Sequence, residues 1–180
     1  MSTYTPDTTP VWLLDIDGVL NSNAKNGWHE APLRRYAYTK GYEYKIRWSP
    51  TLLDRIRAII RDRRADVRWA TSWVGETAQF EKMMGLPALP DAFTLNPDLS
   101  TGPPIKDAST AAKRAAALDV VRSGRRLLWT DDDAIWPDGP ERDELLAAGA
   151  LLIAPDERRG LSPAHMDAID AWLNSNPEVV

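Results

Sequence analysis

Short apolar runs alternate with amphipathic segments along this chain, and this alternation limits the folds it can adopt more than any other feature. Five runs have the length and composition of buried strands, over 11–14, 67–70, 93–95, 126–130 and 150–153. Helices are predicted over 50–64, 76–84, 108–122, 141–148 and 163–173. Strands that alternate with helices form a parallel sheet covered on both faces. We therefore predict one domain over 1–180, with an α/β, Rossmann-like three-layer α/β/α sandwich.

Two helix starts carry the same local signal. Ser49 and Ser162 are each followed by a proline, which places a capping hydroxyl before a residue with φ already suited to the first helical turn. After Pro50, the apolar residues Leu52, Leu53, Ile56, Ile59 and Ile60 recur at helical spacing. This pattern predicts a helix with one buried face.

The composition is that of a soluble globular protein, with 43% hydrophobic and 27% charged residues and a net charge of -4. This charge gives no global attraction to nucleic acid or to anionic membranes. The absence of cysteine excludes disulfides, thiolate metal sites and cysteine nucleophiles. The sequence lacks a signal-peptide pattern and a run of about 18 apolar residues, so we expect a cytoplasmic protein without membrane contact.

Polar residues follow three of the predicted strands. Asp15, Thr71 and Asp131 occupy these positions. Right-handed crossovers bring the carboxyl ends of parallel strands to one edge of the sheet, where ligands bind in folds of this kind. We therefore expect one site at this edge.

Asp15 and Asp17 flank a strand end, and Gly18 lets the backbone turn away from it. Two carboxylates beside a hard cation can divide one displacement into a covalent step and a hydrolytic step. The pattern Asp-x-Asp-Gly also occurs in ordinary turns. Nucleotide-sugar glycosyltransferases use Asp-x-Asp to hold a metal, but usually after a nucleotide-binding unit, and only fourteen residues precede Asp15.

The run Asp15-Ile16-Asp17-Gly18-Val19-Leu20-Asn21 resembles the first motif of the haloacid dehalogenase (HAD) superfamily. Thr71 resembles the second motif, Lys113 the third, and Asp131-Asp132-Asp133 the acidic fourth, in the expected order. The tryptophans beside the second and fourth motifs, with the segment 160–163, are similar to a compact, minimally capped subgroup. That subgroup includes HAD domains associated with RNA-repair proteins.

The resemblance implies a magnesium-dependent phosphohydrolase that works through an aspartyl-phosphate. Asp15 would be the nucleophile, Asp17 the acid and base, and Thr71 a ligand of the phosphoryl group. Gly18 would line the place where the substrate binds. Mg²⁺ would be held by Asp15, the Asp17 carbonyl and Asp131.

Three assignments within these motifs have competitors. Lys106 is the alternative to Lys113, although Lys113 lies only 18 residues before Asp131 (131 − 113), which suits a helix, loop and strand better. Ser72 is the alternative to Thr71 as the hydroxyl that binds the phosphoryl group. Asp132 would hold the metal through water or orient the lysine.

The segment 21–48, between the first motif and the first helix, shows strand alternation instead of helical periodicity. Tyr36 and Tyr38 precede the turn Thr39-Lys40-Gly41, and Tyr42 and Tyr44 follow it, so we predict a small β-hairpin flap. A flap of this size leaves the site open to large substrates. Its basic residues, Arg47 among them, stand between aromatic ones, which suits the phosphate and base of a nucleotide or of a nucleic-acid end. A hairpin whose aromatic residues only pack on the sheet is the competing interpretation.

The leading hypothesis is thus a phosphatase of phosphorylated substrates such as nucleotides or nucleic-acid ends. A catalytically inactive binding module for nucleic acid or a protein partner is the alternative. A receiver-type signalling domain combines similar residues in a different order, which argues against it here.

Overall fold

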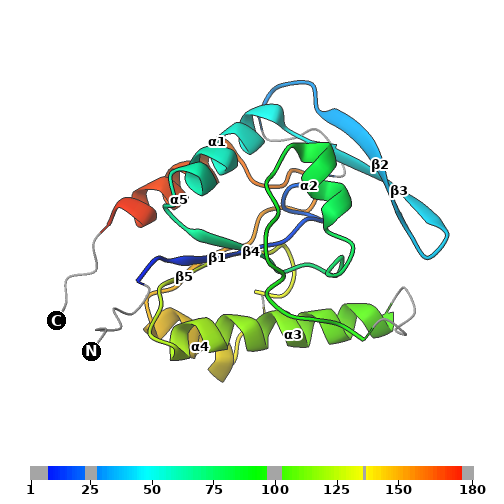
Figure 1. The fold of residues 1–180 in the computed structure, drawn as a ribbon. Coiled ribbons are helices and arrows are strands. Elements are labelled where there is room, and N and C mark those ends of the chain that lie inside the picture. The colour runs from blue at the N-terminus through cyan, green and yellow to red at the C-terminus, as the bar shows by residue number, and fades with distance from the viewer. Residues whose placement is uncertain (1–7, 23–27, 97–102, 136, 176–180) are drawn as a thin grey trace, which may run out of the picture.

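The computed structural model describes residues 8–22, 28–96, 103–135 and 137–175. A four-stranded parallel sheet runs through the centre of the molecule (Figure 1). β1 (Val11–Leu14) lies between β4 (Asp66–Trp69) and β5 (Leu127–Thr130), and β6 (Leu151–Ile153) follows β5 at the edge. The predicted parallel sheet is confirmed.

Side chains alternate along β1 and so divide the core into two layers. Trp12 and Leu14 pack into one hydrophobic cluster, and Val11 and Leu13 pack into another on the opposite face. The first face is covered by α1 (Pro50–Arg61) and α5 (Pro163–Asn174), and the second by α3 (Pro103–Arg122) and α4 (Pro140–Ala147). Figure 1 shows these helix pairs above and below the sheet, which confirms the three-layer α/β/α sandwich.

The capping serines form the contacts that their sequence positions predict. Ser49 accepts a hydrogen bond of 3.0 Å from the backbone N–H of Leu52, and α1 begins at Pro50. Ser162 and His165 form a capping box at the start of α5. The buried side of α1 carries Leu52, Leu53, Ile56 and Ile59, in agreement with the apolar spacing.

The predicted strand over 93–95 is wrong. The chain makes one isolated bridge to β4, from Asp91 to Trp69, and then leaves the sheet edge. Phe93 packs instead, partly buried, against the hydrophobic cluster beneath the sheet, so its side chain is covered without strand pairing. The third helix also begins earlier than predicted, at Pro103, because proline needs no backbone donor in a first helical turn.

The predicted hairpin is present as β2 (Leu33–Thr39) and β3 (Tyr42–Trp48). Lys40 and Gly41 form its two-residue turn with φ of 48° and 81°, the positive values that such turns require. The Gln79 side chain of α2 (Ala78–Met84) accepts a hydrogen bond from Tyr38 N and donates one to Tyr38 O, which attaches the hairpin to α2. Residues 23–27 of the predicted flap segment lie outside the described residues.

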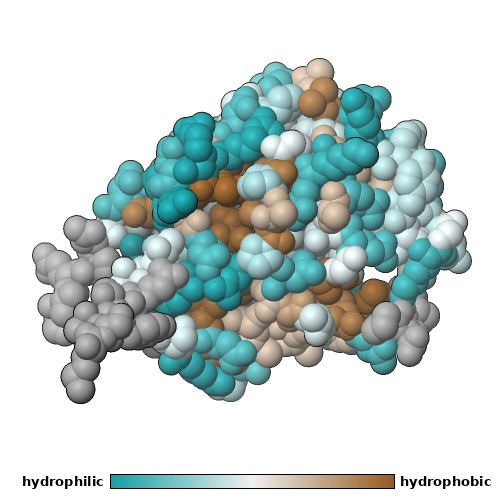
Figure 2. Space-filling model, viewed as in Figure 1, coloured by the Kyte–Doolittle hydropathy of each residue, from teal (hydrophilic) through white to brown (hydrophobic). Residues whose placement is uncertain are grey.

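The surface view shows hydrophilic residues over most of the visible face, with hydrophobic residues in a recess between the two helical layers (Figure 2). Within the described ranges, none of the helices combines the length and the apolar character needed to cross a membrane.

Candidate functional site

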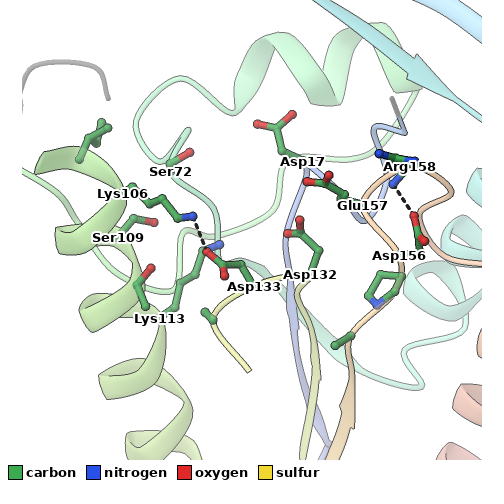
Figure 3. Close-up of a pocket in the computed structure, with 15 residues that line it drawn as sticks. Asp17, Ser72, Lys106, Ser109, Lys113, Asp132, Asp133, Asp156, Glu157 and Arg158 are labelled. Carbon is green, nitrogen blue, oxygen red and sulfur yellow. Dashed lines mark hydrogen bonds and ion pairs between the residues drawn. The ribbon is translucent and has the colours of Figure 1, made fainter. Parts of the chain in front are cut away.

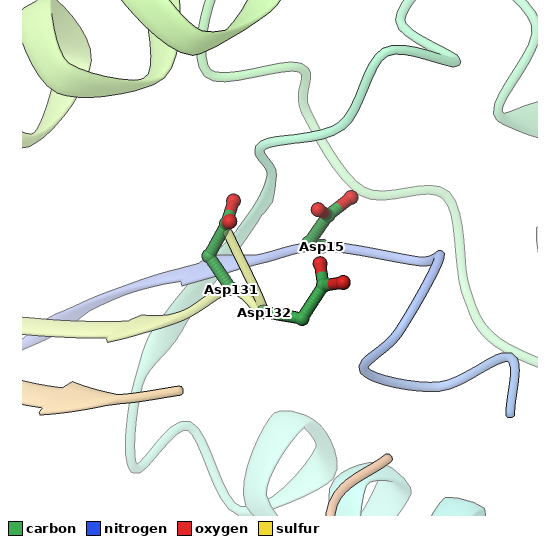
Figure 4. Close-up of side chains that lie close together, drawn as sticks. All are labelled: Asp15, Asp131 and Asp132. Atoms are coloured by element: carbon green, nitrogen blue, oxygen red, sulfur yellow. The ribbon is translucent and has the colours of Figure 1, made fainter. Parts of the chain in front are cut away.

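Three aspartates meet where β1 and β5 end. Asp15 follows β1, and Asp131 and Asp132 follow β5, and all three carboxylates lie close together at this edge (Figure 4). One oxygen from each lies within 4.8 Å of the others. Asp15 and Asp131 are buried, with exposed fractions of 4% and 0%. The expected gathering of strand-end acids at one edge is therefore present.

Lys113 of α3 reaches this cluster from below the sheet. Its Nζ lies 2.5 Å from Asp15 Oδ2 and 2.7 Å from Asp131 Oδ2. The ammonium group is also buried, and its two carboxylate partners raise its pKa although burial alone would lower it. Lys106, the competing lysine, instead pairs with Asp133 at 2.8 Å on the exposed side. The geometry thus favours Lys113 over Lys106 as the lysine of the site.

One lysine does not balance the negative charge of the cluster. Burial, together with nearby Asp131, raises the pKa of Asp15 to about 8, against the opposing effect of Lys113. Burial and Asp131 also raise the pKa of Asp132 to about 6. Full ionisation of this cluster near neutral pH therefore needs more positive charge than Lys113 alone supplies.

The carboxylate oxygens of this cluster are suitable ligands for a magnesium ion. Mg²⁺ prefers oxygen ligands, and the three carboxylates offer oxygens that lie within 4.8 Å of one another. Asp131 Oδ1 is already occupied, because it accepts hydrogen bonds from Asp133 N at 3.0 Å and Ala134 N at 2.6 Å. Asp15 Oδ1 likewise accepts a 2.7 Å hydrogen bond from the backbone N–H of Ile16. Asp132 belongs to the same group of three carboxylates and is a candidate ligand together with Asp15 and Asp131.

Residue 18 must be a glycine because the side chain of Asp132 lies too close for a Cβ atom there. Gly18 has φ of +69°, and a Cβ atom there would lie 2.2 Å from Asp132 Cγ. A side chain at this position is therefore excluded twice, by backbone conformation and by contact. We predicted Gly18 as a substrate-binding residue, and the structure gives it this packing role beside the acidic cluster.

Asp17 is exposed at the mouth of the site, and two donors hold its carboxylate. Asn21 Nδ2 donates to Oδ1 at 2.7 Å, and Trp73 Nε1 donates to Oδ2 at 2.8 Å. Asn21 Oδ1 also accepts from the backbone N–H of Arg47 at 2.9 Å, so the same amide joins Asp17 to the hairpin. The carboxylate is thus oriented before any substrate binds.

Three hydroxyl groups lie near the cluster in different environments. Thr71 is fully buried, and its Oγ1 accepts a 3.4 Å hydrogen bond from Trp73 N. Ser72 lines the open space beside Asp17, which makes it the more accessible hydroxyl of the two. Ser109 lies one helical turn before Lys113, and its buried Oγ has no hydrogen-bond partner among the described residues. The four-residue spacing to Lys113 could have revealed Ser109 from the sequence.

An open pocket of about 850 Å³ lies over these groups (Figure 3). We call it the lysine pocket, and its polar lining includes Asp17, Ser72, Lys106, Ser109, Lys113 and Asp132. Asp156, Glu157 and Arg158 from the loop after β6 form its far wall, which sequence reasoning missed because no motif marks them. Arg47 lines neither this pocket nor its neighbour under the hairpin, so the structure does not bring this predicted residue into the site.

Fold and site together define a Rossmann-like α/β protein with an aspartate-lysine centre at the carboxyl edge of its sheet. The family model described as "HAD domain in Swiss Army Knife RNA repair proteins" matches residues 11–166. The chain therefore belongs to this family, within the HAD superfamily, as the sequence motifs predict. Comparisons with curated proteins and with solved structures gave no match. The family indicates phosphohydrolase chemistry, and the buried aspartate cluster is compatible with metal binding.

Proposed function

We propose that this protein is a magnesium-dependent phosphohydrolase that uses Asp15 as its nucleophile. The observation that carries the proposal is the position of Asp15, whose carboxylate contacts Lys113 and adjoins the other two aspartates of the cluster. A lysine and a cation on either side of this carboxylate would keep it ionised and draw in a negatively charged phosphate. Asp15, Asp131, Asp132 and the Asp17 backbone would hold the cation, which neutralises charge on the transferred group.

The reaction has two steps on this chain's residues. An Asp15 oxygen attacks phosphorus, the ester P–O bond breaks, and Asp17 gives a proton to the departing oxygen. Asp17 then takes a proton from water, the water oxygen attacks phosphorus, and the bond to Asp15 breaks to release inorganic phosphate. Asp17 lies at the pocket mouth with its carboxylate already oriented, which suits a group that must serve both steps. Ser72 and Ser109 line the space where the phosphoryl oxygens would lie.

The substrates we propose are nucleotides or phosphorylated nucleic-acid ends. The family description places related domains in RNA-repair proteins. The hairpin also supports a nucleotide or nucleic-acid substrate. It carries five cationic residues and one acidic residue, although the whole chain is acidic. Its exposed tyrosines Tyr36 and Tyr38 lie on the same face of the hairpin as Lys45, because Tyr36 and Lys45 are directly opposed across the two strands. Cationic and aromatic side chains on one open surface suit phosphates and bases.

The test is a hydrolysis assay with Mg²⁺ or with a chelator. The substrates are an aryl phosphate, nucleotides, and oligonucleotides phosphorylated at the 5′ or the 3′ end. We expect phosphate release that needs Mg²⁺ and that falls by at least about 100-fold in Asp15→Asn. Mass spectrometry of acid-quenched protein should find one phosphoryl group on the peptide that contains Asp15.

The matched control is Asp133→Asn. Asp133 belongs to the same acidic triplet but is exposed and pairs with Lys106 outside the three-carboxylate cluster. This variant should keep most of the activity. Full activity of Asp15→Asn would overturn the assignment of the nucleophile. A wild-type protein that hydrolyses none of these substrates would favour the alternative of a binding module.

A further inference from the structure

A second pocket adjoins the lysine pocket at Asp17. It has a volume of about 490 Å³ and lies between the hairpin and the loop after β4. We call it the hairpin pocket; its lining includes Tyr44, Trp73, Val74, Leu95 and Ile105. Asp17, Ser72 and Ile105 line both pockets, so they form the boundary between them. The size lies in the range of sites that bind small organic molecules.

The position of Asp17 on this boundary divides a bound phosphate ester into two parts. The phosphorus must lie toward Asp15 and Lys113, in the lysine pocket, if Asp15 attacks it. The departing oxygen must lie at Asp17, which protonates it. The group attached to that oxygen then continues past Asp17, and the hairpin pocket is the space on that side.

The aromatic residue available to this group is Tyr44. Trp73 is almost fully buried, and Phe80 packs against it with ring centroids 4.9 Å apart. Tyr44 contacts Trp73 edge-on at 5.3 Å and keeps 38% of its surface exposed. The tyrosine ring therefore stands on a rigid aromatic support while part of its own surface remains open to a ligand.

The hairpin holds Tyr44 in place without a ligand. Gln79 hydrogen-bonds to both backbone groups of Tyr38, and Thr39 Oγ1 donates to Glu76 Oε1 at 2.6 Å. Opposite Tyr44 on β2, Ala37 is fully buried, which anchors this part of the hairpin on the core. A ring positioned in advance loses little freedom on binding.

We propose that the hairpin pocket is the leaving-group subsite and that Tyr44 selects a planar aromatic group there, the base of a nucleoside monophosphate or of a terminal nucleotide. This inference rests on the proposed phosphohydrolase function and adds the residue that determines its specificity. Stacking on an aromatic side chain accepts any base, because every base has a π face. The subsite therefore distinguishes nucleoside esters from alkyl esters and does not distinguish one base from another.

The test compares two substrate types in three tyrosine variants. The probes are adenosine 3′- and 5′-monophosphate and, as an alkyl ester, glycerol 2-phosphate. Tyr44→Leu should lower kcat/KM for the adenosine esters about tenfold and change the value for glycerol 2-phosphate less than about twofold. Tyr44→Phe keeps the ring and should retain the wild-type preference. Tyr42→Leu is the matched control, because Tyr42 lies on the same strand as Tyr44, is 59% exposed and does not line the pocket; it should leave both substrates unchanged.

Equal losses on both substrates in Tyr44→Leu, or no loss on either, would overturn the subsite. Binding of adenosine monophosphate to Asp15→Asn, followed by calorimetry, separates this result from a failure of the proposed function. Binding that Tyr44→Leu weakens, in a protein that hydrolyses no ester, would retain the subsite and reject the phosphohydrolase. Hydrolysis without a Tyr44-dependent preference would retain the phosphohydrolase and reject the subsite.

Discussion

Lys113 Nζ lies 2.5 Å from Asp15 Oδ2 in a place where neither charge meets much water. The same nitrogen lies 2.7 Å from Asp131, so one ammonium group separates two buried carboxylates. In Lys113→Met these carboxylates lose their counter-charge, and removing one partner of a buried ion pair is costly. We expect the free energy of unfolding, measured by urea denaturation at pH of about 8, to fall by about 3 kcal/mol. Phosphate release should fall by at least about 100-fold.

Lys106→Met is the control for this prediction. Lys106 and Asp133 are 67% and 55% exposed, and an exposed ion pair contributes at most about 1 kcal/mol. This variant should therefore unfold almost as the wild type does and lose far less activity than Lys113→Met. If Lys106→Met lost activity and Lys113→Met kept it, the catalytic lysine would be Lys106, the competitor that the sequence left open.

Magnesium should stabilise the protein more at pH of about 8 than at pH of about 5. Burial raises the pKa of Asp15 to about 8 and that of Asp132 to about 6, both above their ordinary values. At these two groups the folded protein thus binds more protons than the unfolded chain, so their contribution to the stability of the metal-free protein falls as the pH rises from about 4 to about 8. A cation that replaces these protons restores the loss. Thermal unfolding with and without Mg²⁺ measures this difference.

The acidic cluster must be the source of that effect. Asp132→Asn removes one of the three clustered carboxylates and should shrink the magnesium shift at the higher pH. Asp133→Asn lies outside the cluster and should leave the shift intact. An equal magnesium shift at both pH values would contradict the link between the cation and these carboxylates.

Two buried serines should respond to alanine in opposite ways. Ser109 Oγ has no partner among the described residues, whereas Ser49 Oγ caps α1 and donates to Glu30. Ser49→Ala should lower the free energy of unfolding by about 1 kcal/mol. Ser109→Ala removes a buried unpaired hydroxyl and should leave that free energy unchanged or raise it by up to about 1 kcal/mol.

The same Ser109 variant should bind phosphate more weakly. Its hydroxyl lines the lysine pocket beside Lys113, and a hydrogen bond to a charged phosphoryl oxygen would be lost. We expect the inhibition constant of inorganic phosphate to rise about tenfold. An unchanged inhibition constant would leave Ser109 without a role in binding phosphate.

Local sequence signals were sufficient to predict the start of a helix and the position of a hairpin turn. Ser49-Pro50 predicts the start of α1, and Lys40-Gly41 marks the hairpin turn, because both depend on backbone geometry within a few residues. The family motifs also predict the strand ends that carry Asp15 and Asp131. The run 93–95 failed because an apolar residue can enter the core without a strand, as Phe93 does.

The parts of the site that escaped prediction depend on contacts between distant segments. Trp73 and Asp17 are 56 residues apart, and nothing in either neighbourhood specifies their hydrogen bond. Arg47 carries a charge that suits phosphate, but its place on β3 keeps it out of both pockets. Tyr44 lies three positions earlier on the same strand. Because successive side chains alternate between the two faces of a strand, Tyr44 lies on the opposite face from Arg47 and lines the hairpin pocket. Register, which tertiary packing sets, therefore decides which hairpin residues can take part.

Gly18→Ala should be more damaging than a glycine's backbone conformation alone explains. Gly18 and Gly41 both have positive φ, at +69° and +81°, but a Cβ at Gly41 meets nothing within 4 Å. Gly41→Ala should therefore lower the free energy of unfolding by about 1 kcal/mol, the cost of the conformation. At Gly18 the added methyl group also collides with Asp132. We therefore expect the free energy of unfolding, measured by urea denaturation, to fall by about 2–4 kcal/mol. Because the collision displaces an aspartate of the cluster, Gly18→Ala should also weaken the magnesium shift in thermal unfolding, which Gly41→Ala leaves intact. Equal costs for the two variants would show that Asp132 moves aside freely, and that Gly18 is needed only for the turn.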